Sequence, residues 1–207
     1  MKRFIVILTA FFCLSIAQDI AGSWNLTAVD VLYHNFARPN AATLDPAFAK
    51  DQATIWACNQ LFNGLVQLND NLEVRPSIAK SWKISEDRLQ YTFNLRNDVY
   101  FHDHEIFQAN RKVVATDFTY SFDRLKSKEL ATPGAWVLAN VTSYLALNDS
   151  TLEINLRTPF PPFLGLLSMQ YCSVVPKEIV ENTNFREVPI GTGPFHFQYW
   201  KEGVKLV

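Results

Sequence analysis

The segment from Leu89 to Arg96 constrains the fold more tightly than any other part of the sequence. Large apolar side chains alternate with polar ones along it, at Leu89, Tyr91, Phe93 and Leu95. A period of two residues places one set of side chains on each face of a β-strand, so the pattern predicts a strand in a sheet with one buried side. Burying four such side chains contributes on the order of 6–12 kcal/mol before entropy is subtracted.

A helix is predicted upstream of this strand. Asp51 is placed to cap it, apolar residues recur at helical spacing to about Asn63, and Gly64 follows as its stop. A short strand from Leu65 to Leu68 comes next, and an earlier strand is predicted from Val29 to Phe36.

A second helix is predicted to begin at Thr116 or Asp117 and to end at about Lys126. Its large apolar side chains recur every three to four residues and form one stripe, which we expect to lie in the core. The stripe consists of Phe118, Phe122 and Leu125.

A β-hairpin is predicted farther along the chain. The strands Val141 to Leu147 and Thr151 to Arg157 are joined by a tight turn at Asn148 to Ser150. We expect this hairpin to share a sheet with Leu89 to Arg96. The proline-rich run from Pro159 to Phe163 favours an extended approach to the first turn of a short helix.

The last residues also alternate. Phe195, Phe197 and Tyr199 alternate with polar residues, and a turn at Lys201 to Gly203 leads into Val204 to Val207. The pattern predicts a strand and a return strand. No closing signal follows, so we expect the chain to stop within a sheet.

The N-terminus has the features of a secretory signal peptide. Lys2 and Arg3 precede an apolar stretch from Phe4 to Ile16, and small residues follow at the cleavage positions. We expect residues 1–17 to be a signal peptide, which places the protein outside the cytoplasm. One alternative is a lipoprotein signal lipidated at Cys13, and another is a buried N-terminal helix.

The net charge of the chain argues against one class of partner. The formal net charge of -1 shows no basic excess of the kind that nucleic-acid binding requires, so no nucleic acid is expected as a partner.

Removal of the leader would leave Cys58 and Cys172. Two separate buried thiols are favoured over a disulfide, because free cysteine is among the most buried residue types and an oxidising compartment only permits a bridge.

No catalytic site and no metal site is expected. His102 to Glu105 contains four residues of metal-binding type, but adjacent side chains mostly point apart, which favours a polar loop. Gly191 to Gly193 is followed by Pro194 instead of a helix, so a phosphate cradle is not expected. The sequence has no Gly-x-Ser-x-Gly motif and no recognisable spacing of Ser, His and acid.

Six motifs nevertheless occur in a fixed order over about 150 residues, and chance collinearity of that many motifs is far rarer than one chance match. They are Thr43 to Pro46, Leu61 to Leu65, Pro76 to Trp82, Phe101 to Asp103, Ala115 to Phe122 and Gly191 to Phe195. In this order they resemble the family 5 extracellular solute-binding proteins, which are oligopeptide- and dipeptide-binding components of ABC importers.

The resemblance implies an α/β, periplasmic-binding-protein type II-like fold that is incomplete. It implies a signal peptide at 1–17, a first segment of lobe I at 18–62, an inserted small mixed α/β domain II at 63–173, and a truncated returning segment of lobe I at 174–207. The third domain of the family is expected to be absent. Because that domain would supply most charged contacts to a peptide's ends, residues 18–207 are expected to bind peptides only weakly.

The resemblance also implies a function without enzymatic activity or a cofactor. The protein would be a monomer that captures peptides in the periplasm or at the exterior of the cell envelope and delivers them to membrane permease subunits. Ala49, Lys50, Asp51 and Gln52 correspond to a segment that lines the cleft in oligopeptide binders. Alternatively, Lys50 and Asp51 only start the helix.

The sequence is also compatible with other functions. The same fold could bind another solute, such as a nickel chelate, haem or an oligosaccharide. An exported peptide hydrolase and a sensor module joined to a regulator are the alternatives outside solute transport.

Overall fold

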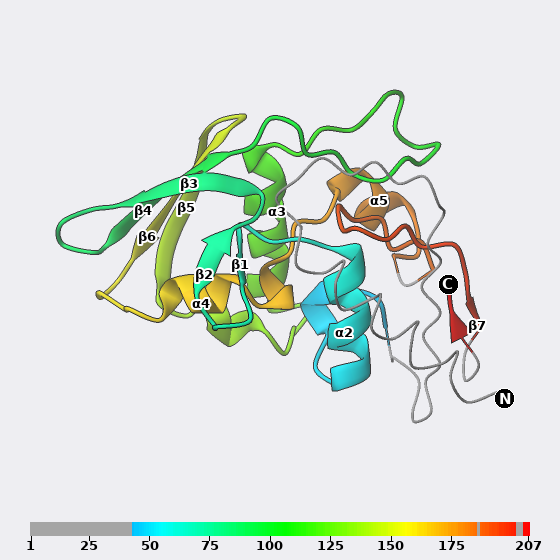
Figure 1. Ribbon diagram of the computed structural model, residues 1–207, viewed down its shortest axis with the longest axis horizontal. Coiled ribbons are helices and arrows are strands. Elements are labelled where there is room, and N and C mark those ends of the chain that lie inside the picture. Colours follow the sequence, from blue (N-terminus) through cyan, green and yellow to red (C-terminus); the bar gives the residue numbers. More distant parts are fainter. Residues whose placement is uncertain (1–42, 186, 202–204) are drawn as a thin grey trace, which may run out of the picture. The chain divides into compact units, whose positions relative to one another are not determined.

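The computed structural model describes residues 43–185, 187–201 and 205–207 (Figure 1). The expected signal peptide, Cys13 and the predicted strand from Val29 to Phe36 lie outside these residues. The helices are η1 (Pro46–Phe48), α2 (Gln52–Leu61), α3 (Ala115–Lys126), η2 (Ala135–Leu138), α4 (Phe163–Leu167), η3 (Gln170–Cys172) and α5 (Lys177–Asn182). The strands are β1 (Val66–Leu68), β2 (Val74–Pro76), β3 (Ala79–Ile84), β4 (Gln90–Leu95), β5 (Val141–Asn148), β6 (Thr151–Leu156), β7 (Trp200–Lys201) and β8 (Lys205–Leu206).

A four-stranded antiparallel sheet with the order β3-β4-β6-β5 is the largest sheet of the described residues. The predicted alternation of β4 is confirmed, because Tyr91, Phe93 and Leu95 are all buried. The predicted hairpin is β5 and β6, and it lies in the same sheet, with Phe93 of β4 opposite Leu152 of β6. The sheet therefore has the one buried face that the sequence predicts.

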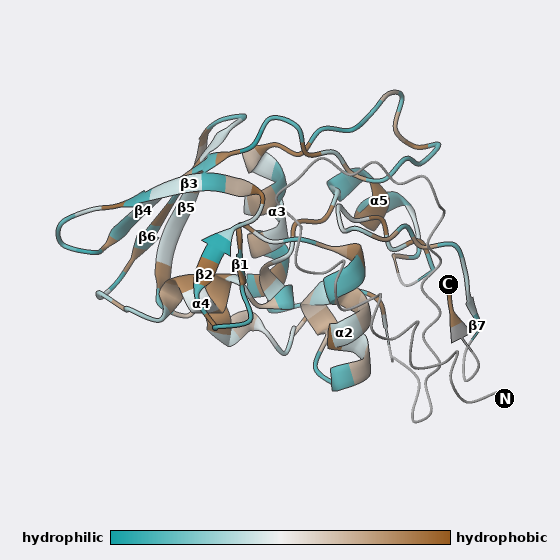
Figure 2. Cartoon of the chain, in the orientation of Figure 1, coloured by the Kyte–Doolittle hydropathy of each residue, from teal (hydrophilic) through white to brown (hydrophobic). Residues whose placement is uncertain are grey.

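Helix α3 covers this buried face. Its predicted apolar stripe is confirmed, since Phe118, Phe122 and Leu125 are each 0% exposed. The ring of Phe122 meets that of Tyr144 on β5 edge to face, with centroids 5.4 Å apart, a favourable geometry for two aromatic rings. Figure 2 shows that the short helix α4 is largely hydrophobic, and its Phe163 packs against Tyr91 at 5.0 Å between ring centroids.

Helix α2 begins as predicted and ends earlier than predicted. The Asp51 side chain accepts hydrogen bonds from the backbone N of Thr54 (2.9 Å) and from its hydroxyl (2.8 Å), which caps the helix. At the other end, Phe62 is already extended, with φ -131° and ψ 153°, so Gly64 is not the stop. The extended backbone lets the buried Phe62 ring pack against Phe185, at 5.9 Å between centroids.

The C-terminal strand prediction is wrong in position. The chain forms no strand from Phe195 to Tyr199, and the paired strands β7 and β8 begin only at Trp200, next to the backbone hydrogen bonds that Tyr199 and Val207 exchange. The cause is a competing backbone partner, because the N–H of Phe195 donates to the carbonyl of Gln60 at 3.2 Å. This stretch therefore follows the end of α2 before it reaches β7.

Among the described helices, none combines the length and apolar character that spanning a bilayer requires.

The two cysteines of the described chain are separate buried thiols, as predicted. Burial raises the pKa of the Cys172 thiol to about 12, and burial also raises that of Cys58 far above its ordinary value. The thiolate is the reactive form, so both groups are protected twice, by low ionisation and by lack of access.

We therefore expect neither Cys58 nor Cys172 to react with iodoacetamide at pH 8 in the folded protein within the time that labels a small-molecule thiol completely. Peptide mapping by mass spectrometry after labelling, with a urea-unfolded sample as the control, measures this at each cysteine. Rapid labelling of either site in the folded protein would contradict the burial described above.

Candidate functional site

The predicted cleft segment from Ala49 to Gln52 joins η1 to α2. Ala49 is buried, and its carbonyl accepts a hydrogen bond from the Nε2 of Gln170 at 2.8 Å. Both carboxylate oxygens of Asp51 accept hydrogen bonds from Thr54 in the helix cap. Lys50 and Gln52 are exposed. The segment thus starts the helix, and it leaves two polar side chains that point to solvent.

An ion pair fixes the loop that leads into this segment. Arg124, in the last turn of α3, donates to both carboxylate oxygens of Asp45, and one of these contacts is 3.0 Å long. The two side chains are only 11% and 9% exposed. Asp45 also caps η1 by accepting from the N–H of Ala47 at 3.0 Å. The residues are 79 positions apart, so no sequence spacing predicts the pair.

A second charged group ties α3 to α5. Arg111 donates to Asp117 at the start of α3 (2.6 Å) and to Glu178 of α5 (2.8 Å), and its guanidinium lies 5.7 Å from the centre of the Phe101 ring. Asp117 also accepts from the N–H of Val114 at 2.9 Å and so caps α3. Burial raises the pKa of the Asp117 carboxyl, although Arg111 and this cap act against the shift.

The loop between β4 and α3 reaches toward α5 (Figure 1) and is held to the Gly-Thr-Gly motif. The backbone N–H of His102 donates to the Gly191 carbonyl at 2.9 Å, and its Nε2 lies 2.9 Å from the Gly193 carbonyl oxygen. A Cβ on Gly191 would lie 1.9 Å from the carbonyl oxygen of Leu61. Both glycines therefore permit close packing of backbone on the end of α2.

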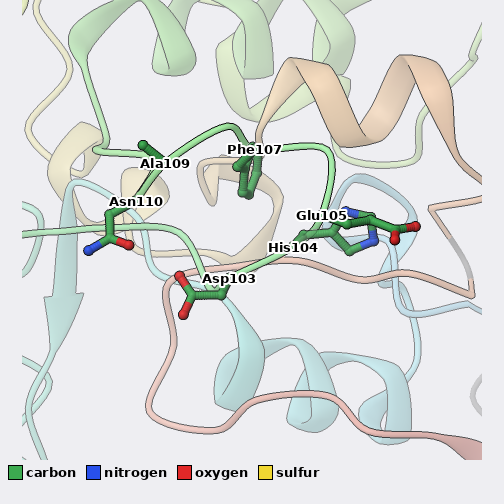
Figure 3. Close-up of a pocket in the computed structure, with 6 residues that line it drawn as sticks. All are labelled: Asp103, His104, Glu105, Phe107, Ala109 and Asn110. Atoms are coloured by element: carbon green, nitrogen blue, oxygen red, sulfur yellow. The ribbon is translucent and has the colours of Figure 1, made fainter.

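The same loop lines a pocket of about 430 Å³ that is open to solvent. Figure 3 shows Asp103 and Asn110 at one end and His104 with Glu105 at the other, with Phe107 between them. The lining residues are Asp103, His104, Glu105, Phe107, Ala109 and Asn110. Across residues 43–207, so far as the structure describes them, no three His, Cys, Asp or Glu side chains gather as metal ligands.

Comparison with known proteins matches most of this fold. Residues 73–207 match the family model described as bacterial extracellular solute-binding proteins, family 5 Middle. The dipeptide-binding protein of Escherichia coli K12 is 30% identical over 165 residues, which are 70% of this chain and 31% of that protein.

Two solved structures are also similar. The periplasmic binding protein DppA from Helicobacter pylori, in complex with the peptide STSA, is 32% identical, with a TM-score of 0.72 over 81% of this chain and 36% of that one. NikZ from Campylobacter jejuni, in complex with Ni(L-His), is 34% identical, with a TM-score of 0.69 over 80% of this chain and 33% of that one. The chain thus spans about a third of the length of the relatives it matches.

These similarities define the class of the protein. The fold is part of the mixed α/β, type II-like fold of periplasmic binding proteins, as the sequence motifs predict. Within this class, the chain belongs to the bacterial extracellular solute-binding proteins of family 5. The homologues are solute-binding proteins and not enzymes.

Proposed function

We propose that the protein is the substrate-binding component of an ABC importer and that it captures peptides outside the cytoplasmic membrane. The observation that carries the proposal is the match to a peptide-bound periplasmic protein over 81% of this chain at 32% identity. Extended peptides suit such a site, because main-chain hydrogen bonds give affinity for any sequence and side-chain pockets add only selectivity.

Within the Ala49–Gln52 segment, Lys50 and Gln52 are the residues that we expect to contact the solute. Ala49 is buried with its carbonyl already bonded, and the Asp51 carboxylate is occupied by the helix cap. The ammonium of Lys50 is exposed, carries a positive charge and can meet the carboxylate at the end of a peptide.

The proposed domain division is a first segment of lobe I at 18–62, an inserted domain II at 63–173 and a returning segment of lobe I at 174–207. It is supported by the contact between the two proposed crossing points, where the N–H of Val174 donates to the carbonyl of Asn63 at 3.0 Å. A domain inserted at these points would begin and end at neighbouring positions of the backbone, as a stable insertion requires.

An exported location, permease subunits as partners, a monomeric state and the lack of enzymatic activity belong to the same proposal. Homologues of this family are periplasmic, which supports export. A second solute class has a specific observation in its favour, since the similar Campylobacter jejuni protein was solved with Ni(L-His). A nickel chelate is therefore the alternative to a peptide.

The test is mass spectrometry of solutes that co-purify with the protein expressed from its whole reading frame, followed by calorimetric titration of those solutes. We expect short peptides to be released intact. We also expect Lys50→Ala to weaken peptide binding by at least about tenfold, because a charged hydrogen bond contributes about 1.5–3 kcal/mol.

Lys80→Ala on β3 is the matched control, since Lys80 is also an exposed lysine, and it should leave the affinity unchanged. A released nickel chelate would support the alternative solute. Hydrolysis of the added peptide would point instead to an exported peptidase.

A further inference from the structure

Two histidines from distant parts of the sequence lie side by side. His102 belongs to the loop between β4 and α3, and His196 belongs to the stretch before β7. Their ring centroids are 4.8 Å apart, and the ring planes are inclined by 44°. His102 is partly buried, whereas His196 is exposed. Solvent therefore reaches the pair from the side of His196.

The surroundings fix which nitrogen of each ring carries the proton. His102 Nε2 lies 2.9 Å from the Gly193 carbonyl oxygen, and His196 Nδ1 lies 3.0 Å from the Phe197 carbonyl oxygen. A carbonyl oxygen only accepts, so each of these nitrogens must donate. A neutral imidazole has a single N–H. The free lone pairs are therefore on His102 Nδ1 and His196 Nε2.

One of these lone pairs lacks a hydrogen-bond partner. His102 Nδ1 is buried, and none of the described residues donates to it. An unsatisfied buried acceptor costs about 1–3 kcal/mol, so native proteins rarely keep one without a purpose or a missing ligand.

A metal ion would satisfy both lone pairs at once. Histidines that bind metals typically donate their other N–H to a carbonyl or carboxylate, which is the arrangement of both rings here. With metal–nitrogen bonds of about 2.0–2.1 Å, two imidazoles on one ion have ring centroids about 4.5 Å apart at a nitrogen–metal–nitrogen angle of about 90° and about 5.2 Å apart at the tetrahedral angle. The observed separation of 4.8 Å lies within this range.

We propose that His102 Nδ1 and His196 Nε2 form a binding site for a divalent transition-metal ion, of the class that prefers imidazole: Zn²⁺, Ni²⁺ or Cu²⁺. Water completes the coordination shell on the solvent side. Of the run from His102 to Glu105, only His102 is a ligand in this site, and the second imidazole comes from the stretch before β7, near the other end of the described chain. The ion would join the loop after β4 to the stretch before β7, independently of any solute in the cleft.

The test is calorimetric titration of Zn²⁺ and Ni²⁺ into untagged protein that has been stripped with EDTA. We expect saturable binding of one ion per chain and a loss of affinity of at least about tenfold in His196→Ala, which removes an exposed ligand. His102→Gln should have the same effect on the metal while keeping a side-chain N–H for the Gly193 carbonyl. Circular dichroism confirms that each variant is folded.

The chain contains four histidines, so the remaining two serve as controls. His104→Ala, in the pocket of Figure 3, and His34→Ala should each leave the affinity within about twofold, because neither belongs to the pair. Electron paramagnetic resonance with Cu²⁺ should show two coupled imidazole nitrogens, and one in His196→Ala. Absence of saturable binding, or binding that His196→Ala leaves unchanged, would overturn the proposal.

Discussion

Replacing Gly191 with alanine is expected to destabilise the protein by at least about 3 kcal/mol, at the upper end of the cost of overpacking. The added Cβ would lie 1.9 Å from the carbonyl oxygen of Leu61 and 2.6 Å from the ring of Phe62. The first of these atoms is backbone at the end of α2, and it cannot move without disturbing the helix end. Urea unfolding followed by circular dichroism measures the change.

Gly165→Ala is the matched control for this substitution. Gly165 lies within α4, and a Cβ there would meet nothing within 4 Å. Alanine has a helix propensity about 1 kcal/mol better than glycine, so the control should unfold at the same urea concentration or a higher one. Equal midpoints for Gly191→Ala and the unaltered protein would show that the backbone at Leu61 yields to the new methyl group.

The close approach at Gly191 also shows what periodicity in a sequence can and cannot predict. The alternation of β4 and the stripe of α3 are local patterns, and each maps directly onto one buried face. The predicted strand from Phe195 to Tyr199 has equally good alternation and does not form, because the N–H of Phe195 donates to Gln60 instead of to a neighbouring strand. Alternation predicts which residues could form a strand. It gives no information on which backbone groups will be their hydrogen-bond partners.

The candidate site likewise combines a local feature that the sequence predicts with long-range contacts that it does not predict. The cap at Asp51 follows from residue type and position, and it was predictable. The pairing of His102 with His196 and that of Asp45 with Arg124 depend on how distant segments fold together. The Phe-His-Asp and Thr-Leu-Asp-Pro motifs mark one partner of each pair, but nothing in their spacing points to the other.

Removing the Arg124 side chain is the second substitution with a large expected effect. Arg124→Ala should destabilise the protein by about 3–5 kcal/mol, because it leaves the carboxylate of Asp45 buried without its cation. Arg96→Ala is the control, since its pair with Asp98 is about half exposed and such a pair contributes less than about 1 kcal/mol. Urea unfolding measures both changes.

A double-mutant cycle separates the pair from the buried charge. Asp45→Asn keeps an oxygen for the cap of η1, and Arg124→Met keeps an apolar chain of similar length beside Phe185, whose ring centre lies 5.8 Å from the guanidinium. Together they remove both charges, so the double variant should be more stable than the sum of the single losses predicts, by about 1–3 kcal/mol. Strict additivity would mean that Asp45 and Arg124 act independently. In that case, the Asp45–Arg124 ion pair would not be the interaction that holds the end of α3 to the proposed first segment of lobe I. Helix α3 itself lies in the proposed inserted domain.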